Sequence, residues 1–261
     1  MNVSSLSCTY QASFRDVIDD IYKSLFVRIS IVWIVVIAMI IMQFTYASTL
    51  VMMGATVILT IGVGALTLYY YKNLLFEILL VINVFKYRFL GWEWWHKIEC
   101  ARDTQTDTLY LGALPLKRFH HVEKLREIGC KSIFSVLEKF ELKTHTLCGK
   151  ADLVGMMDVG NNVRIKVPDF SPVEINILET GVKWLHEQLQ LYKTVYIHCK
   201  SGVGRSALVV CAYLVEYCSM DPEGARDYVA NIRHDIFSDK SRQMDRLREY
   251  YDRRKKMIKS L

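Results

Sequence analysis

The sequence predicts an α/β domain, a central sheet flanked by helices, that follows a hairpin of two membrane-spanning helices. Two observations predict this fold class. Downstream of Trp95, short strand-like runs alternate with helix-like stretches, an order typical of a sheet covered by helices on both faces. Upstream, residues 29–71 contain no Asp, Glu, Lys or Arg, and a soluble core rarely needs so long an uncharged stretch.

The uncharged block is too long for one membrane helix and fits two. Residues 29–46 and residues 49–71 each approach the roughly 20 residues that a spanning helix needs, and Ala47 and Ser48 would form the turn between them. Basic residues flank the block on both sides, at Arg28 and Lys72 among others, whereas the turn has none. The positive-inside rule therefore places residues 1–28 and the downstream domain on the cytosolic side, or the equivalent matrix side.

Residues 72–95 follow the second span and allow three interpretations. They are mostly apolar but carry charges, and they are rich in aromatic residues near their end. They could form a juxtamembrane helix lying at the membrane interface. They could instead form a third span, at the cost of burying Glu77, or a helix packed on the soluble domain.

Residues 96–239 are predicted to form the α/β domain itself. Strands are expected at residues 108–111, 131–136, 164–167 and 194–199, and helices at residues 116–129, 173–191, 206–218, 222–232 and 241–256. Residues 240–261 form a basic helical tail with nine Lys or Arg and three Asp or Glu, a surplus equal to the +6 charge of the whole chain. We expect this tail to meet anionic lipid rather than nucleic acid.

The seven cysteines predict neither a disulfide framework nor a structural zinc site, because their number is odd and no C-x-x-C pair occurs. They fit a reducing compartment in which one thiol is kept for chemistry. His145 and Cys148 resemble half a metal site without a partner pair. We therefore expect no metal and no cofactor.

The stretch V-Y-I-H-C-K-S-G-V-G-R-S, residues 195–206, has the layout of a phosphate-binding catalytic loop. Residues 199–206, here called the cysteine loop, would lie between a strand and a helix. Gly202 and Gly204 permit a tight turn in which the backbone N–H groups from Ser201 to Gly204, including that of Val203, point inward. The helix N-terminus adds partial positive charge, and Arg205 can hold two phosphate oxygens at once.

A thiol at the bottom of such a cradle ionises readily, since helix N-termini and nearby cations lower thiol pKa values. Cys199 is therefore the predicted nucleophile for attack on phosphorus, with a phosphocysteine intermediate. Ser206 would donate a hydrogen bond to the sulfur as it leaves, and His198 would support the thiolate. Lys200 would be a secondary contact for the bound anion. The leaving alkoxide also needs a proton from a carboxylic acid on a nearby loop.

H-C-K-S-G-V-G-R-S resembles the signature loop of the cysteine-based protein tyrosine phosphatase superfamily, in its dual-specificity branch. The finer resemblance is to the mitochondrial phosphatidylglycerophosphate phosphatase subfamily and spans residues 94–251. Four stretches carry it: W-W-H-K-I, L-Y-L-G-A-L-P-L, I-F-S-V-L-E-K-F-E, and A-Y-L-V-E-Y through N-I-R-H. The resemblance implies the dual-specificity phosphatase fold.

The resemblance also implies further site residues. The family's general acid is an Asp some 30 residues before the cysteine; here V-P-D-F-S-P places Asp169 there, with Asp158 the next nearest candidate. Glu138, Phe140 and Glu141 resemble the subfamily's acidic-aromatic loop. One position differs, because several lipid-directed relatives have Arg or Lys where this chain has Val203.

The expected function is a membrane-anchored phosphatase that hydrolyses phosphomonoesters, most simply on a lipid head group such as phosphatidylglycerophosphate. A membrane-tethered protein tyrosine or dual-specificity phosphatase would use the same chemistry, and a non-catalytic phosphate-binding scaffold would use the same loop. The resemblance implies the mitochondrial inner membrane, with the endoplasmic reticulum or another membrane as the alternative. The expected substrate is accordingly a phosphorylated lipid or a phosphoprotein.

Overall fold

The structure, a computed structural model, describes residues 34, 37–38, 61–62, 64, 75–102, 105–143, 145–146, 149–150 and 162–259. The chain divides into two compact units, Met1–Val81 and Ile82–Leu261.

Few residues of the first unit are described upstream of residue 75. Those at positions 34, 37, 38, 61, 62 and 64 are all helical and exposed, and they include three exposed isoleucines, Ile34, Ile37 and Ile61. The predicted spans at residues 29–46 and 49–71, like residues 1–28, otherwise lie outside the described residues. Among the residues that are described, no helix has the length and apolar character needed to cross a membrane.

The segment predicted at residues 72–95 contains a helix over residues 75–89 and then turns into a strand. Gly91 has a φ of 69°, a left-handed conformation that suits glycine, just after this helix. Strand β1, Trp95–Arg102, follows. It was not predicted, because the aromatic residues before it were interpreted as the end of an interfacial helix.

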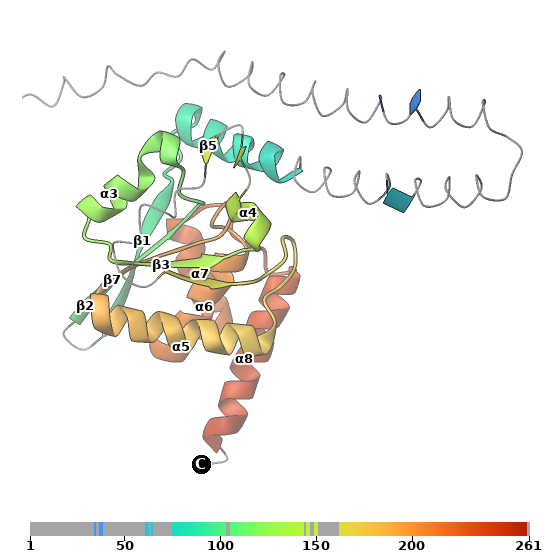
Figure 1. Cartoon of the computed structure of the whole chain (residues 1–261). Coiled ribbons are helices and arrows are strands. Elements are labelled where there is room, and N and C mark those ends of the chain that lie inside the picture. Colours follow the sequence, from blue (N-terminus) through green and yellow to red (C-terminus); the bar gives the residue numbers. More distant parts are fainter. Residues whose placement is uncertain are drawn as a thin grey trace, which may run out of the picture. The chain divides into compact units, whose positions relative to one another are not determined.

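The second unit is built on a five-stranded sheet in the order β1-β2-β7-β3-β6 (Figure 1). Strand β2, Gln105–Gly112, pairs antiparallel with β1 and parallel with β7, Thr194–His198. Strand β3, Ser132–Val136, pairs parallel with both β7 and β6, Asn162–Ile165. The central strands β3 and β7 read SIFSV and TVYIH and are buried almost throughout, as expected for strands covered on both faces.

Helices pack on both faces of this sheet, as predicted. On one face, α3, His121–Glu127, places Val122 and Leu125 against Ile133 and Tyr196. On the other, α5, Ile175–Tyr192, brings Trp184 to 4.6 Å from the ring of Phe134. Neighbouring residues of a strand point to opposite faces, so Ile133 and Phe134 divide the core between the two helices.

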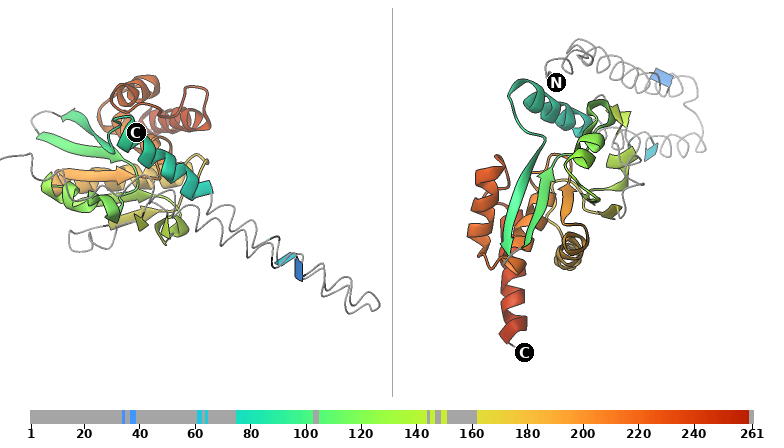
Figure 2. Two further views of the ribbon diagram at one scale, coloured as in Figure 1. Left: turned by 90° about the horizontal axis from the view of Figure 1, so that it is seen from above. Right: turned by 90° about the vertical axis from the view of Figure 1, so that its left-hand side faces the viewer.

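Helix α6, Arg205–Tyr217, is the most deeply buried helix of the described unit, and every residue from Arg205 to Val215 is buried. It contacts α5, α7 (Pro222–Ile232) and α8 (Arg242–Lys259). Figure 2 shows the far end of α8 extending away from the sheet. Met244, Leu247 and Tyr250 of α8 are buried, so one face of the basic tail belongs to the core while its charges line the outside.

Several short elements differ from the prediction. Residues 116–129 form a 3-10 turn, Lys117–Phe119, and then α3, because His120 adopts a left-handed φ of 52° between them. Helix α4, Lys139–Lys143, and the hairpin of β4, His145–Thr146, with β5, Gly149–Lys150, were not predicted. They are only two to five residues long, too short for a periodic pattern to indicate them.

Candidate active site

The cysteine loop begins where β7 ends and closes where α6 begins. His198 is the last residue of β7 and Arg205 the first residue of α6. Gly202 has a φ of 74°, and a Cβ placed there would lie 2.4 Å from the carbonyl oxygen of Gly112. Only glycine satisfies both the backbone conformation and the close approach of β2. The loop therefore folds tightly against the end of the neighbouring strand.

Cys199 is buried at the base of this loop, with 2% of its surface exposed. Its sulfur accepts hydrogen bonds from the hydroxyl of Ser206 at 3.2 Å and from the backbone N–H of Gly202 at 3.3 Å. Burial raises the pKa of Cys199, but the charge of Arg205 and the hydrogen bonds from Ser206 and Gly202 outweigh it, so the pKa lies below its ordinary value. The thiolate is thus stabilised before any substrate binds.

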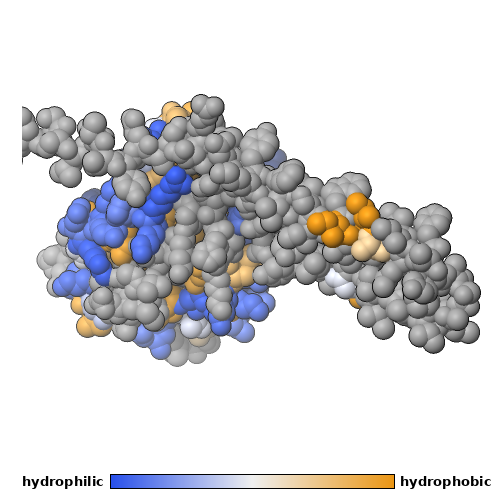
Figure 3. Space-filling view, turned by 45° about the horizontal axis from the view of Figure 1, so that its top comes forward, coloured by the Kyte–Doolittle hydropathy of each residue, from blue (hydrophilic) through white to orange (hydrophobic). Residues whose placement is uncertain are grey.

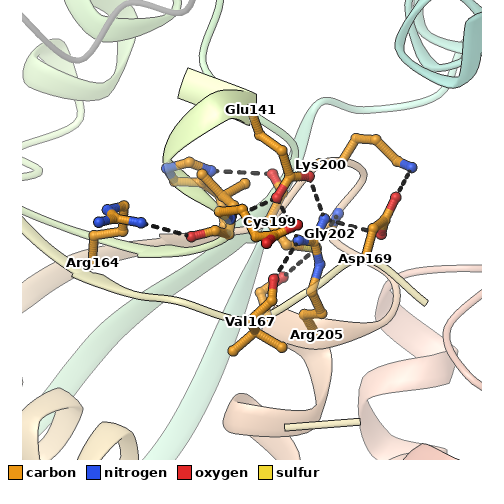
Figure 4. A network of polar contacts seen from close by, with 12 residues as sticks. Glu141, Arg164, Val167, Asp169, Cys199, Lys200, Gly202 and Arg205 are labelled. Atoms are coloured by element: carbon orange, nitrogen blue, oxygen red, sulfur yellow. Dashed lines mark hydrogen bonds and ion pairs between the residues drawn. The ribbon is translucent and has the colours of Figure 1, made fainter. Parts of the chain in front are cut away.

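Arg205 is held by a bidentate pair with Glu141 of α4 (Figure 4). Its Nη1 and Nη2 donate to the two carboxylate oxygens at 2.7 and 2.8 Å, and Nη1 also donates to the carbonyl of Val167 at 3.0 Å. Burial opposes the charge of Arg205, but its hydrogen bonds to Glu141, with the charges of Cys199, Glu141 and Asp169, raise its pKa. Arg205 is therefore a permanently charged group of fixed orientation beside the thiol.

Asp169 contacts the same guanidinium. Its carboxylate is 3.0 Å from Nη2 of Arg205 and forms a short ion pair with Lys200 of the cysteine loop. The residue follows Pro168 in the loop between β6 and α5, which therefore delivers a carboxyl group to the phosphate-binding end of β7. Asp158, the other candidate acid, lies outside the described residues.

His198 supports the loop from below and does not contact the thiol itself. Its Nε2 lies 2.8 Å from the hydroxyl of Ser135 on β3, and its Nδ1 lies 3.1 Å from the carbonyl oxygen of Cys199. Burial lowers the pKa of His198 to about 4, so the ring is neutral near pH 7. The sequence did not indicate Ser135, whose contact with His198 depends on the pairing of two distant strands.

Arg233, after α7, is a second buried arginine that the sequence did not indicate as functional. It donates to the carbonyls of Gly202 and Ser201 at 3.0 and 2.7 Å and contacts Nδ1 of His96 at 2.9 Å. Burial and the charge of Arg233 lower the pKa of His96, so the neutral ring accepts this hydrogen bond. Arg233 thus holds two loop carbonyls outward, which leaves the loop's N–H groups directed toward the thiol side.

The remaining loop residues are fixed by backbone contacts. The carbonyl of Val203 accepts a hydrogen bond from the N–H of Phe237 at 3.0 Å, and the carbonyl of Gly204 accepts one from Leu208 in the first turn of α6. These contacts keep both carbonyls away from the thiol. The structure therefore brings together every residue that the sequence assigned to the site from residue 198 to residue 206, together with Asp169.

The other cysteines of the described region are not part of this site. Cys130 and Cys211 are free and buried. Cys218 is disulfide-bonded. No group of three His, Cys, Asp or Glu side chains that could hold a metal ion occurs among the residues the structure describes.

A low-pKa thiol within a loop of backbone amides, with a charged arginine fork above it, defines a phosphatase that works through cysteine. The sequence profile of the dual specificity phosphatase catalytic domain matches residues 133–253. Together with the relatives that follow, this match shows that the chain belongs to the dual-specificity phosphatase family and is a cysteine-based phosphoric monoester hydrolase.

Within that family, the chain is similar to phosphatidylglycerophosphate phosphatases. Mouse phosphatidylglycerophosphatase and protein-tyrosine phosphatase 1 is 31% identical over 183 residues, which cover 69% of this chain and 89% of the mouse protein. Arabidopsis thaliana phosphatidylglycerophosphate phosphatase PTPMT1 is 28% identical over 192 residues, or 71% of this chain but only 51% of the plant protein. A crystal structure of PTPMT1 in complex with PI(5)P matches 64% of this chain and 99% of its own, with a TM-score of 0.52 and 25% identity.

Proposed function

We propose that this protein is a membrane-anchored phosphatase that hydrolyses the phosphomonoester of a lipid head group, phosphatidylglycerophosphate or a close analogue. The observation that carries the proposal is the stabilised thiolate of Cys199 beneath the cysteine loop, in a chain whose relatives are named for this lipid. Cys199, Arg205, Asp169, Ser206 and His198 are the proposed catalytic group. Lys200 and the loop from Ser201 to Gly204 are the proposed phosphate contacts.

In the first step the thiolate of Cys199 attacks phosphorus, and the bond from phosphorus to the ester oxygen breaks. Arg205 and the loop N–H groups stabilise the charge on the non-bridging oxygens. Asp169 transfers a proton to the departing oxygen, which leaves as an alcohol. Because Asp169 pairs with both Arg205 and Lys200, an incoming phosphate competes for these cations and displaces the carboxyl toward the ester oxygen.

In the second step water attacks the phosphocysteine, and Asp169, now a carboxylate, accepts a proton from it. The bond between sulfur and phosphorus breaks, and Cys199 leaves as a thiolate. The hydroxyl of Ser206, 3.2 Å from the sulfur, stabilises the negative charge that the sulfur regains. Inorganic phosphate is released, and the site returns to its starting charge without a cofactor.

The proposed anchor is the pair of helices at residues 29–71, preceded by residues 1–28 and followed by an interfacial segment at residues 72–95. Ile34, Ile37 and Ile61 support it, because apolar side chains that are exposed on a helix suit contact with lipid. Ile82, Phe85, Phe89 and Leu90 of the following segment are also exposed. Figure 3 shows hydrophilic residues with hydrophobic ones between them on the visible described surface of the catalytic unit. The same segment also packs on the catalytic unit, where Lys86 pairs with Asp235 at 2.9 Å and the ring of Tyr87 contacts that of Phe119. We therefore propose that the segment lies on the domain with one face and meets the membrane interface with its exposed apolar face.

The proposed location follows from the flanking charges and from the relatives. The catalytic domain, residues 96–239, and the basic tail, residues 240–261, would lie on the cytosolic or matrix side of the membrane. The tail's exposed Lys and Arg would add attraction to anionic lipid. The resemblance favours the mitochondrial inner membrane, with the endoplasmic reticulum or another membrane as the alternative.

A membrane-tethered protein tyrosine or dual-specificity phosphatase is the second candidate. The mouse relative's name includes protein-tyrosine phosphatase, and the chemistry at Cys199 would be unchanged. Only the surroundings of the pocket would decide between the two substrates.

The test is phosphate release by the detergent-purified full-length chain from phosphatidylglycerophosphate and from a phosphotyrosine peptide in parallel, with Cys199→Ser as the blank. We expect kcat/KM for the lipid to exceed that for the peptide by at least about tenfold. Two additional hydrogen bonds to the lipid head group would together account for about this factor. A preference for the peptide would favour the second candidate. Turnover retained by Cys199→Ser would contradict the phosphocysteine mechanism for both.

A further inference from the structure

The loop that carries Asp169 exposes an aromatic side chain at the edge of the catalytic pocket. Phe170 follows Asp169 directly and is 61% exposed. Its φ is 60°, in the left-handed region that a bulky residue rarely adopts. Such a backbone persists only where surrounding contacts enforce it, and it is often found where a ligand is bound.

Two cations enforce this conformation. Arg242, the first residue of α8, donates from Nη2 to the carbonyl of Phe170 at 3.1 Å. Lys200 of the cysteine loop places its Nζ 4.8 Å from the centre of the Phe170 ring, a cation–π distance. Lys200 also pairs with Asp169. Arg242 therefore lies one residue from the general acid, on the rim of the pocket.

The start of α8 lies on this rim for a second reason. A Cβ placed on Gly204 of the cysteine loop would lie 4.0 Å from the side-chain nitrogen of Gln243. The first two residues of α8 thus border the site, Arg242 at the Asp169 loop and Gln243 near the cysteine loop.

The charge of Arg242 is exposed and is not neutralised by a neighbouring carboxylate. The acidic residues three positions away on either side are engaged elsewhere: Asp239 with Arg226 at 3.6 Å and Asp245 with Arg248 at 3.7 Å. Within the described part of the chain, no carboxylate lies within ion-pair distance of Arg242. By contrast, Arg205 is paired with both Glu141 and Asp169.

We propose that Arg242 and Phe170 form a second subsite, which binds the phosphodiester of a phospholipid whose monoester phosphate lies at Cys199. The guanidinium of Arg242 would pair with the phosphodiester, and the ring of Phe170 would pack against the adjoining glycerol and acyl carbons. The inference rests on the proposed function and deepens it. It assigns a substrate class with two phosphates separated by one glycerol unit.

Three alkyl monoesters with the same leaving-group chemistry test this subsite. Glycerol 3-phosphate has one phosphate, glycerophosphoglycerophosphate has two phosphates without acyl chains, and phosphatidylglycerophosphate has both. Arg242→Gln in the full-length protein should lower kcat/KM about tenfold on the two substrates with a second phosphate, the loss expected for one charge-assisted contact. It should change kcat/KM on glycerol 3-phosphate less than about twofold.

Two further variants complete the experiment. Phe170→Ala should lower kcat/KM on the acylated lipid more than on its deacylated form, because only the lipid offers apolar carbons to the ring. Arg126→Gln, which removes the same charge from an exposed position on α3 outside the site and the basic tail, is the matched control and should leave all three values unchanged.

An equal loss on all three substrates in Arg242→Gln would overturn the subsite, since it would show that Arg242 only positions the Asp169 loop. No loss on any substrate would overturn it as well. These results differ from failure of the proposed function, which the wild-type protein alone reveals. If the wild-type protein hydrolyses glycerol 3-phosphate but favours neither substrate with two phosphates, the proposed lipid substrate is wrong. The proposed subsite is then wrong as well.

Discussion

The cysteine loop after β7 and the interior of helix α6 each bury a free cysteine, but they have opposite effects on its pKa. Cys199 and Cys211 are both almost inaccessible to solvent. Burial raises the pKa of Cys211 far above its ordinary value, whereas the pKa of Cys199 is lowered despite the same burial. Cys130, two residues before β3, resembles Cys211, because burial raises its pKa to about 11.

The difference lies in what each sulfur meets. The sulfur of Cys211 donates to the carbonyl oxygen of Ala225 at 3.8 Å, and a carbonyl cannot stabilise a thiolate. The charge of Arg226 offsets only part of the effect of burial on the pKa of Cys211. The sulfur of Cys199 accepts from Ser206 and Gly202 and lies near the charge of Arg205. Burial alone makes a cysteine inert. Burial within a loop of donors makes it a nucleophile.

The largest expected effect comes from substituting each of the two cysteines separately. Cys199→Ser should lower kcat on p-nitrophenyl phosphate by at least about 10⁴-fold, because an un-ionised hydroxyl replaces the thiolate nucleophile. Cys211→Ala should retain kcat within about twofold and lower the free energy of unfolding by about 1 kcal/mol, the cost of a small cavity. Steady-state rates measure kcat, and urea unfolding measures the free energy of unfolding. Comparable losses of kcat in the two variants would contradict the distinction between a nucleophilic Cys199 and an inert Cys211.

The next effect is expected at Arg205, whose charge lies beside Cys199. Arg205→Lys keeps a positive charge but cannot form the bidentate pair with Glu141 seen here. We expect kcat/KM to fall about 10²–10³-fold, the range for losing oriented transition-state donors. Circular dichroism of the variant controls for folding. A fall of less than tenfold would mean that charge alone, without orientation, suffices.

How much of this site the sequence predicted depends on the distance between its parts. The cysteine loop, its strand and α6 form a continuous stretch with a clear apolar pattern, so residues 198–206 could be assigned directly. Asp169 came from the resemblance to a family, since a lone Asp in a Pro-containing turn is not distinctive. The pairings of Arg205 with Glu141, 64 residues away, and of Arg233 with His96, 137 residues away, depend on the fold and have no local signal.

The fold shows the same division. The buried strands β3 and β7 and the helices α5 to α7 have strong periodic patterns, and the prediction found each within a few residues. Strand β1 reads WHKIECAR, without a sustained alternation of polar and apolar residues, and it is an edge strand with one neighbour. Its pairing with β2, rather than any pattern of its own, makes it a strand.

A more selective effect is expected at the general acid. Asp169→Asn should lower kcat about 10²–10³-fold on glycerol 3-phosphate, whose leaving alkoxide needs a proton, the range for losing a general acid. The loss on p-nitrophenyl phosphate should be less than about tenfold, because its phenolate leaves without protonation. The measurement is the ratio of the two losses in one preparation. Equal losses would move the general acid to another residue, Asp158 first.

The smallest expected effect tests the hydrogen bond that distinguishes Cys199 from Cys211. Ser206→Ala removes the donor at 3.2 Å, so the pKa of Cys199 should rise toward its ordinary value while turnover falls about tenfold, the worth of one hydrogen bond to a charged group. Since only the thiolate reacts, inactivation by iodoacetamide should slow as pH falls through the pKa of Cys199. Its midpoint should lie at higher pH in the variant. An unchanged midpoint would show that Arg205 alone stabilises the thiolate.

The most direct test of the central claim is to trap the covalent intermediate on the wild-type full-length protein. The protein would be mixed with ³²P-labelled phosphatidylglycerophosphate, quenched with acid within one turnover, digested, and analysed by mass spectrometry. We predict phosphate on the peptide that contains Cys199, and none on the peptides that contain Cys130 or Cys211. Turnover of the lipid with no phosphate on Cys199, or with phosphate on another residue, would contradict the claim that the cysteine loop makes this thiol the nucleophile.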